Sequence, residues 1–428
     1  MKPRTPTPAT RARRSGRLAD PVMRAVLALG ITQITAWGTS YYCLGVLAAP
    51  ISQDTGWSRG FVFLGFTVAL LAMALVSSAA GRAIDRHGGR AVMTLGTVLI
   101  SAGLFALAHV RREPVYLAVW AFLGVGMRLS LYDAAFAALV QVDPARGRKA
   151  ISYVTLFGAF ASSVFWVVGH ALDQQVGWRQ TLVLFALINL VVCLPLHWLG
   201  LGRRDAAAAG PGPAESSQTS EPSPLEGRAR SVAIVLFALV MSLSGCVFSV
   251  VSVQLVSLLE AAGLATAVAV WVASMKGAAQ FGGRVVEIVF ARNLQAITVG
   301  RIAVGLLPVS LLLLLTGAGN LSLVVAFTLL MGGCQGVLTI VRGAVPLAMF
   351  GARGYGAVLG VIAAPISVVN AAAPTAFAWI VDRWGWPAAR VALLAGAAAA
   401  WLVMEAMARW YERQGRRVGG RQAARSSG

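Results

Sequence analysis

The chain has 428 residues, of which 57% are hydrophobic and only 12% are charged, and its mean hydropathy is +0.73. Soluble domains are typically about 45–50% apolar and about 25% charged, so this composition argues against a water-soluble fold. The formal net charge of +20 comes from 36 basic and 16 acidic residues. Because the basic residues stand between the apolar runs, they indicate membrane topology rather than nucleic-acid binding.

Apolar runs of about twenty residues recur along the chain, which is the length that a helix needs to cross a hydrocarbon core of about 30 Å. They predict an all-α polytopic membrane protein with twelve transmembrane helices. A basic tail, 1–23, precedes the first helix, and a second basic tail, 412–428, follows the last. The predicted helices are 24–50, 60–80, 91–110, 114–140, 150–173, 179–201, 231–260, 264–290, 296–316, 320–350, 354–382 and 387–411.

A linker is predicted at 202–230, because most of it is rich in Ala, Gly, Pro, Ser and Glu and nearly free of large apolar residues. It divides the chain into two six-helix halves, 24–201 and 231–411. Placing both termini in the cytoplasm puts 26 basic residues on the cytoplasmic side and six on the other. The positive-inside rule therefore favours this orientation, and the Arg-rich, Ala-rich composition suggests a bacterial inner membrane.

The two halves resemble each other. The fourth predicted helix reads GMRLSLYDAAFAALV from Gly126, and the tenth reads GVLTIVRGAVPLAMF from Gly336. Each is followed, after 51 and 49 residues respectively, by a Gly-Trp pair, which begins at Gly177 in one half and at Gly385 in the other. Parallel repeats that meet at a midplane site are a transporter architecture, because one half can rock against the other.

The segment after the second predicted helix reads GRAIDRHGGR, from Gly81 to Arg90. A degenerate copy stands at the matching place of the eighth predicted helix and reads Gly283-Arg284-Val285-Val286-Glu287. The pair resembles the cytoplasmic signature loop of the major facilitator superfamily, and the resemblance extends over 24–411. It implies two pseudo-symmetric six-helix bundles and transport by alternating access. The stretch YYCLGVLAAPISQDTGWSRG, from Tyr41 to Gly60, is similar to the oxalate/formate and monocarboxylate porter branch.

By this resemblance the two loop copies form a conformational latch. Asp85 inherits the charge contacts between the halves that favour the outward-facing state, and as an anion it can face a helix N-terminus or an arginine. The alternative is a solvated positive-inside loop. The predicted latch residues are Gly81, Arg82, Asp85, Arg86, Gly88, Arg90, Gly283, Arg284 and Glu287.

Ionisable residues inside the predicted helices are candidates for binding, since a charge near the bilayer centre costs at least ~2.5–3.5 kcal/mol. By the resemblance, Arg128 and Arg342 face one central cavity from opposite halves, where two guanidiniums suit a carboxylate. Tyr132 shares the face of Arg128. On a continuous helix Asp133 is rotated ~140° from Arg128 and is expected to make a different contact. In the alternative interpretation, each arginine ties helices together by pairing with Asp133 or a backbone carbonyl.

Other polar residues could serve the same site. Lys276 would add a third cation or extend toward the cytoplasmic edge, and Tyr41 and Gln33 would offer neutral hydrogen bonds. Asp133 is the candidate proton carrier, because a carboxyl group in a low-dielectric site can titrate near neutral pH.

These features predict a secondary active transporter of a small organic anion such as a monocarboxylate, coupled to protons or to a counter-anion. Two alternatives stay open: efflux of a drug, or of a metalloid held by Cys43, Cys246 and Cys334, and a membrane sensor that does not transport. No enzymatic activity, metal or cofactor is predicted, and the sequence has no phosphate-binding loop of the ATPase type. The basic tails are expected to contact anionic lipids rather than nucleic acid.

Overall fold

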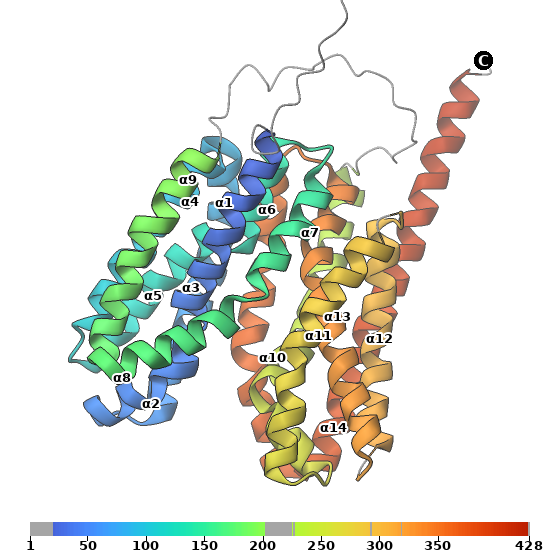
Figure 1. The fold of residues 1–428 in the computed structure, drawn as a ribbon. Coiled ribbons are helices and arrows are strands. Elements are labelled where there is room, and N and C mark those ends of the chain that lie inside the picture. Colours follow the sequence, from blue (N-terminus) through green and yellow to red (C-terminus); the bar gives the residue numbers. More distant parts are fainter. Residues whose placement is uncertain (1–19, 202–224, 226, 292, 318, 427–428) are drawn as a thin grey trace, which may run out of the picture.

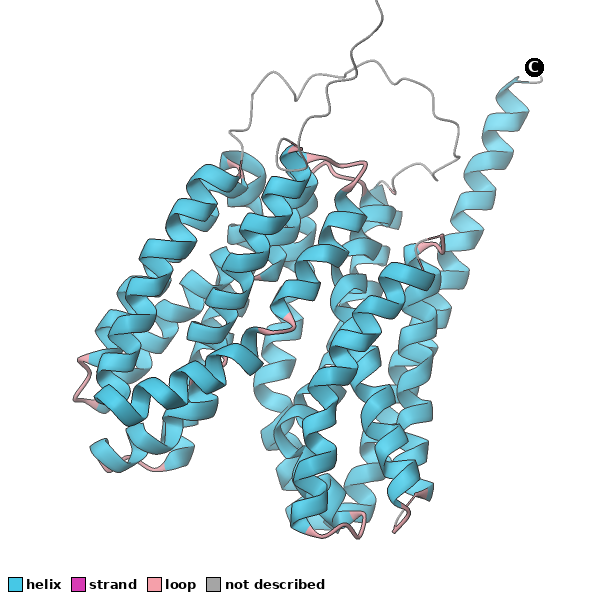
Figure 2. Cartoon of the chain, viewed as in Figure 1, coloured by secondary structure: helices cyan, strands magenta, loops and turns pink. Residues whose placement is uncertain are grey.

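The computed structural model describes residues 20–201, 225, 227–291, 293–317 and 319–426. Across these residues the regular structure is entirely helical, without a strand (Figure 2). Most of the predicted N-terminal tail and most of the predicted linker lie outside the described residues. The all-α prediction is confirmed.

The N-terminal half begins with a transmembrane segment that is itself divided. Its helices are α1 (Pro21–Ala36), the π-helix η2 (Trp37–Tyr41), α2 (Leu44–Thr55), α3 (Arg59–His87), α4 (Gly89–Ala108), α5 (Glu113–Ser130), α6 (Tyr132–Val142), α7 (Gly147–Gly158), α8 (Ala161–Ile188), the π-helix η3 (Asn189–Cys193) and α9 (Leu194–Gly200). The C-terminal half contains fewer and longer helices. They are α10 (Gly227–Ala261), α11 (Thr266–Phe290), α12 (Ala296–Thr316), α13 (Leu321–Phe350) and α14 (Tyr355–Ser426).

Two glycines, one in α8 and one in α14, each divide a helix into two separate membrane crossings. Gly177 in α8 has φ 78°, and Gly385 in α14 has φ 76°, a backbone conformation that favours glycine and that turns the chain back. These are the glycines of the two predicted Gly-Trp pairs. Eight helical stretches of the described chain are long and apolar enough to span a membrane, and those at 147–200 and 355–414 each contain one such turn. With the divided first segment and the charged helix α11, the described residues form the twelve predicted crossings.

Several helix ends differ from the prediction. Helix α3 continues to His87, so most of the first latch copy is helical rather than a loop. Helix α10 begins at Gly227, inside the predicted linker, and α14 continues to Ser426, through most of the predicted C-terminal tail. The prediction ended these helices where apolar residues stop, whereas backbone hydrogen bonding continues into polar sequence.

The two halves stand side by side, as Figure 1 shows with the N-terminal half in blue to green and the C-terminal half in yellow to red. They meet near the end of the bundle at which α1 begins, at Pro21, and diverge toward the opposite end, where α2 lies. We call these the closed end and the open end.

Small residues allow the helices to approach closely, which is the usual packing in membranes because lipid offers no hydrophobic drive between helices. A Cβ atom on Gly81 would collide with the backbone of Gly356, and one on Gly283 with the backbone of Gly333. Large apolar side chains point outward instead: Leu75 is 86% exposed and Phe290 is 76% exposed. Such an apolar surface suits contact with lipid.

Candidate functional site

A cavity of about 530 Å³ lies between the two halves. Its lining residues include Phe136 of α6 and Arg284 of α11. Phe63, near the start of α3, and Thr375, beyond the middle of the first crossing of α14, also line it and belong to the parts of those helices nearer the open end. The cavity therefore extends from the middle of the bundle toward the open end.

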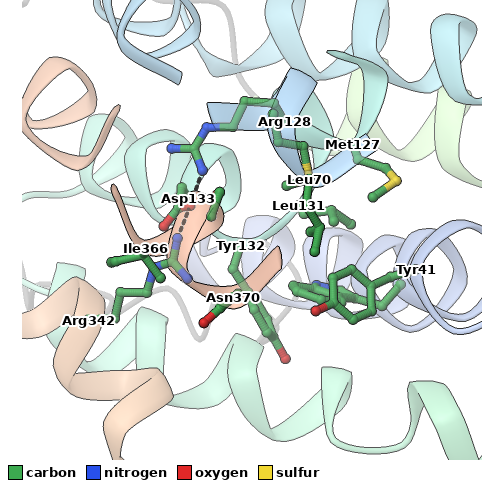
Figure 3. A pocket seen from close by; sticks show the side chains of 13 residues that line it. Tyr41, Leu70, Met127, Arg128, Leu131, Tyr132, Asp133, Arg342, Ile366 and Asn370 are labelled. Atoms are coloured by element: carbon green, nitrogen blue, oxygen red, sulfur yellow. Dashed lines mark hydrogen bonds and ion pairs between the residues drawn. The ribbon is translucent and has the colours of Figure 1, made fainter. Parts of the chain in front are cut away.

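Three charged side chains meet at the inner part of this space (Figure 3). Arg342 of α13 donates a hydrogen bond from Nη2 to Asp133 Oδ2 over 2.6 Å, and Arg128 of α5 donates from Nη1 to the same oxygen. The side chains of Arg128 and Asp133 are only 3% and 9% exposed, and that of Arg342 is 27% exposed. Arg342 lines the large cavity, whereas Arg128 and Asp133 line a smaller adjoining hollow of about 50 Å³.

The cluster carries one more positive than negative charge. Asp133 Oδ1 and Arg342 Nε are both buried and have no hydrogen-bond partner among the described residues. A buried charge without full compensation is costly, so the excess cation favours an anion in the adjoining space. Arg342 is the member of the cluster that such an anion can reach from the large cavity.

Asp133 meets Arg128 because the fourth crossing is not one continuous helix. Helix α5 ends at Ser130 and α6 begins at Tyr132, and between them Leu131 has the extended conformation φ −82°, ψ −169°. The expected rotation of ~140° between the two side chains assumed an unbroken helix, and it was wrong for that reason. The ion pair belongs to the alternative interpretation, in which arginines tie helices together.

Gln33 supports this break. Its Nε2 donates a hydrogen bond of 2.8 Å to the carbonyl oxygen of Ser130, the last residue of α5. Its Oε1 accepts a hydrogen bond of 3.0 Å from Trp37 Nε1. Gln33 is fully buried and does not line the cavity, so the structure places it behind the site rather than in it.

The other predicted binding residues fall into two groups. Tyr41 and Tyr132 both line the cavity, in the same wall as Trp37. Lys276 does not line it: the side chain is buried, and Nζ donates a hydrogen bond of 2.7 Å to Ser252 Oγ, which does. The structure thus brings together Arg128, Tyr132, Asp133, Arg342 and Tyr41. Lys276 lies behind the cavity wall, with Ser252 between it and the cavity.

The first latch copy lies at the closed end and contacts the other half. Asp85 accepts hydrogen bonds from the backbone N–H groups of Gly356 (2.9 Å) and Ala357 (2.7 Å), in the first turn of α14. A helix N-terminus leaves these groups without partners inside the helix, and its dipole favours a negative charge. Gly81 lies against the same turn, where a Cβ atom would collide with the carbonyl oxygen of Gly356.

The second latch copy is not a loop at all, because Gly283, Arg284 and Glu287 lie within α11. Arg284 Nη1 donates a hydrogen bond of 2.7 Å to the carbonyl oxygen of Thr155, near the end of α7. Arg284 was predicted only as a residue of the cytoplasmic latch, but its buried side chain also lines the cavity.

Glu287, one turn further along α11, makes the side-chain contacts of the second copy. Its Oε1 accepts a hydrogen bond of 3.2 Å from Arg148, and its Oε2 accepts one of 3.0 Å from Ser152. Arg148 also donates to the carbonyl oxygens of Ala291 and Leu294, just beyond the end of α11. All of these contacts join α7 of one half to the other half.

The remaining latch residues are Arg82, Arg86, Gly88 and Arg90. Arg82 and Arg86 are exposed, and Gly88 has φ 83° where α3 ends. The guanidinium of Arg90 lies 4.0 Å from the centre of the Trp198 ring, in the same half.

The residues of α7 that contact the other half were not predicted as site residues. Arg148, Ser152 and Thr155 stand at spacings of four and three residues, so a helical face was readable from the sequence. Their partners on α11 were not, because the pairing depends on how the halves meet. Asn370 of α14 lines both hollows and was likewise not singled out.

The four cysteines are free, and none of them lines either hollow. Among the described residues no group of three or more His, Cys, Asp or Glu side chains is arranged to hold a metal ion. The metalloid alternative therefore gains no support from the geometry of Cys43, Cys246 or Cys334.

Comparison with known structures gives the same fold repeatedly. The chain is similar to the human organic anion transporter MFSD10 (TETRAN), with a TM-score of 0.70 and 16% identity over 90% of this chain and 99% of that one. It is similar to the proton:xylose symporter XylE (0.70, 13%, 90% and 95%) and to the transporter FucP in the outward conformation (0.67, 14%, 90% and 99%). At such identities the likeness shows the fold alone.

No curated protein sequence matches the chain. Residues 29–319, more than half of the chain, match the family model described as Major Facilitator Superfamily. This agrees with the twelve helices, the two halves and the doubled motif. The chain belongs to the Major Facilitator Superfamily and is an integral membrane protein of the transporter class.

Proposed function

We propose that the protein is a secondary active transporter of a small organic anion that binds at Arg342. The observation that carries the proposal is the convergence of Arg128 and Arg342 on the single carboxylate of Asp133, in a cavity between the halves. Arg342 presents an unpaired Nε and a partly exposed guanidinium, whose planar fork matches a carboxylate. One of the structurally similar proteins is named an organic anion transporter, which agrees with the proposal.

Asp133 occupies, in this state, the position on Arg342 that a substrate carboxylate would take. An arriving anion would compete with Asp133 Oδ2 for Arg342, while Arg128 continues to hold Asp133. The displaced carboxylate oxygen could then accept a proton, which would couple anion transport to proton transport. If transport instead requires an anion on the opposite side, Asp133 would simply return to Arg342 between the two passages.

The described conformation is closed at the end that carries Pro21 and open at the other. With both termini in the cytoplasm of a bacterial cell, as the distribution of basic residues favours, this is an outward-facing state. The contacts of Asp85, Arg284 and Glu287 across the halves would form the cytoplasmic closure and would break when the halves rock. The basic tails would then lie beside anionic lipid headgroups.

The test is uptake of radiolabelled carboxylates by purified protein in proteoliposomes, with and without an inward proton gradient or an internal anion. Arg342→Gln should lower the initial rate by about tenfold or more, because it removes a charge-assisted bidentate contact. Arg342→Lys should retain part of the rate, since it keeps the charge and loses the fork. Arg59→Gln is the matched control, because Arg59 is exposed and does not line the cavity.

Carboxylate uptake that is unchanged in Arg342→Gln would contradict the assignment of the site. Absence of carboxylate uptake, together with energy-dependent export of amphipathic compounds, would favour the drug-efflux alternative. Stimulation by the proton gradient that is lost in Asp133→Asn, with binding retained, would support the proton-coupling role of Asp133.

A further inference from the structure

The two walls of the large cavity differ in chemistry. The wall from the N-terminal half is aromatic, and its ring-bearing members nearest the charged cluster are Trp37, Tyr41, Tyr42, Phe66, Tyr132 and Phe136. The wall from the C-terminal half carries most of the polar side chains, including two arginines, mixed with apolar ones such as Phe248, Leu338 and Ile366. Its uncharged polar members include Ser244, Ser249, Gln280, Gln335, Thr339 and Asn370.

The aromatic rings form one connected surface. The ring centres of Trp37 and Tyr41 lie 4.7 Å apart, those of Trp37 and Tyr132 lie 5.0 Å apart, and those of Tyr41 and Phe66 lie 4.8 Å apart. Tyr132 directly precedes Asp133, so this surface begins at the charged cluster (Figure 3). A ligand whose carboxylate contacts Arg342 would therefore place the rest of its body beside aromatic rings.

The polar wall has unused hydrogen-bonding capacity. Ser244 Oγ and Asn370 Oδ1 are buried and have no partner among the described residues. Gln280 Nε2 donates a hydrogen bond of 2.8 Å to Gln335 Oε1. The side-chain atoms Gln280 Oε1 and Gln335 Nε2 are then left for other partners. An unsatisfied buried polar group is costly, so a ligand that satisfies it gains affinity.

We infer that the transported anion is an aromatic carboxylic acid that bears a hydroxyl or amino group, an inference that rests on the proposed function of Arg342. The carboxylate contacts Arg342, the ring packs against Trp37 and Tyr41, and the polar substituent reaches Asn370. The cavity volume of about 530 Å³ suits a ligand of this kind, since pockets for drug-sized ligands are about 300–1,000 Å³.

Other classes of solute use less of this site. An aliphatic acid of one to three carbons would engage Arg342 but would leave the aromatic wall without a partner. A neutral sugar would engage both walls but would leave the excess positive charge of the cluster uncompensated. Only an acid with a planar body and a polar substituent satisfies the arginine, the rings and the unpaired amide together.

The experiment measures dissociation constants of the full-length protein for a matched series: 4-hydroxybenzoate, benzoate, cyclohexanecarboxylate, acetate and phenol. We expect benzoate to bind about tenfold more tightly than acetate, because ring stacking adds to the shared carboxylate contact. Cyclohexanecarboxylate should fall between them, 4-hydroxybenzoate should exceed benzoate by a few-fold, and phenol, which lacks the carboxylate, should bind most weakly.

Variants test each wall separately. Tyr41→Leu should reduce the preference for benzoate over acetate, whereas Tyr41→Phe should keep it, because it retains the ring. Asn370→Ala should abolish the preference for 4-hydroxybenzoate over benzoate. Phe105→Leu is the control, because Phe105 is an exposed ring on α4 outside the cavity.

Equal binding of acetate and benzoate, with both lost in Arg342→Gln, would overturn the aromatic inference and leave the proposed anion transporter intact. Binding of phenol as tight as that of benzoate, unaffected by Arg342→Gln, would overturn both. Failure of every carboxylate in the series to bind would also overturn both.

Discussion

The two copies of the signature motif make the same kind of contact with opposite charges. In the first copy Asp85 places an anion at the N-terminal turn of α14, on the backbone N–H groups of Gly356 and Ala357. In the second, Arg284 places a cation on the carbonyl oxygen of Thr155, near the C-terminal end of α7. Each copy thus meets the helix end whose dipole attracts its charge.

These contacts explain how the closed end can be both specific and reversible. A charge at a helix end contributes about 0.3–1 kcal/mol when exposed and up to ~2 kcal/mol when partly buried. Several such contacts together favour the closed state without locking it, since each can be exchanged for water as the halves separate. The pair of Arg148 and Glu287 adds a side-chain contact to the second copy.

The largest effect should come from filling the close approach at the first copy. Gly81→Val places side-chain atoms where the carbonyl oxygen of Gly356 lies, so the closed end could not form as described. We expect the initial transport rate to fall by about tenfold or more, because alternating access requires this closure. Gly277→Val is the matched control, since nothing lies within 4 Å of a Cβ atom at that helical glycine. Normal transport by Gly81→Val would show that the contact is dispensable.

A smaller effect is expected when only the charge of the first copy is removed. Asp85→Asn keeps an acceptor oxygen but loses the attraction between a carboxylate and the helix N-terminus, at a cost of about 1–2 kcal/mol. The ratio of molecules with this end open to molecules with it closed should rise by up to about thirtyfold. Distances between spin labels placed on the two halves would report this shift. Arg82→Gln, at an exposed position of the same motif, should leave the distance distribution unchanged.

The second copy can be tested by a double-mutant cycle of Arg148 and Glu287. Glu287 is buried, so Arg148→Gln alone leaves a poorly compensated carboxylate, and the double variant Arg148→Gln with Glu287→Gln should recover part of the loss. We expect a coupling free energy of about 1 kcal/mol, because Arg148 is partly exposed and solvent screens the pair. Strictly additive effects on the state populations would mean that the ion pair does not contribute to closure.

The smallest effect should come from a helix-end contact inside one half. Asp20 caps α1 by accepting a hydrogen bond from Val22, and a hydrogen bond from Arg146 lowers the pKa of Asp20 below its ordinary value of 3.8. Because the folded-state pKa is the lower one, this stabilisation is present above pH 3.8 and is lost as the pH falls through the folded-state pKa.

The melting temperature of Asp20→Asn should therefore lie slightly below that of the wild type near neutral pH and approach it in acid. The spin-label distances should not change, since this contact does not cross the halves. A shift in the state populations would instead assign Asp20 a role in closure.

Much of the fold could be predicted because it depends on local features. The length of each apolar run predicts a membrane crossing, and the Gly-Trp pairs at Gly177 and Gly385 correspond to the turns that divide α8 and α14. The choice of Asp85 as a latch anion also came from the sequence, and the structure places it on a helix N-terminus of the other half. The residues expected to bind a substrate remain proposals, although Arg128, Asp133 and Arg342 lie together.

The twelve crossings, the two halves and the charged residues inside the membrane could be predicted, because they follow from composition and periodicity along the chain. Which of these charges meet depends on how the helices pack. Asp133 reaches Arg128 because Leu131 interrupts the helix, and Gln33, 97 residues away from Ser130, accommodates the interruption by a hydrogen bond. The hydrogen bond of Arg284 likewise joins distant parts of the chain, because its partner Thr155 lies 129 residues away, in the other half. Such pairings depend on how helices pack, which a pattern along one helix does not encode.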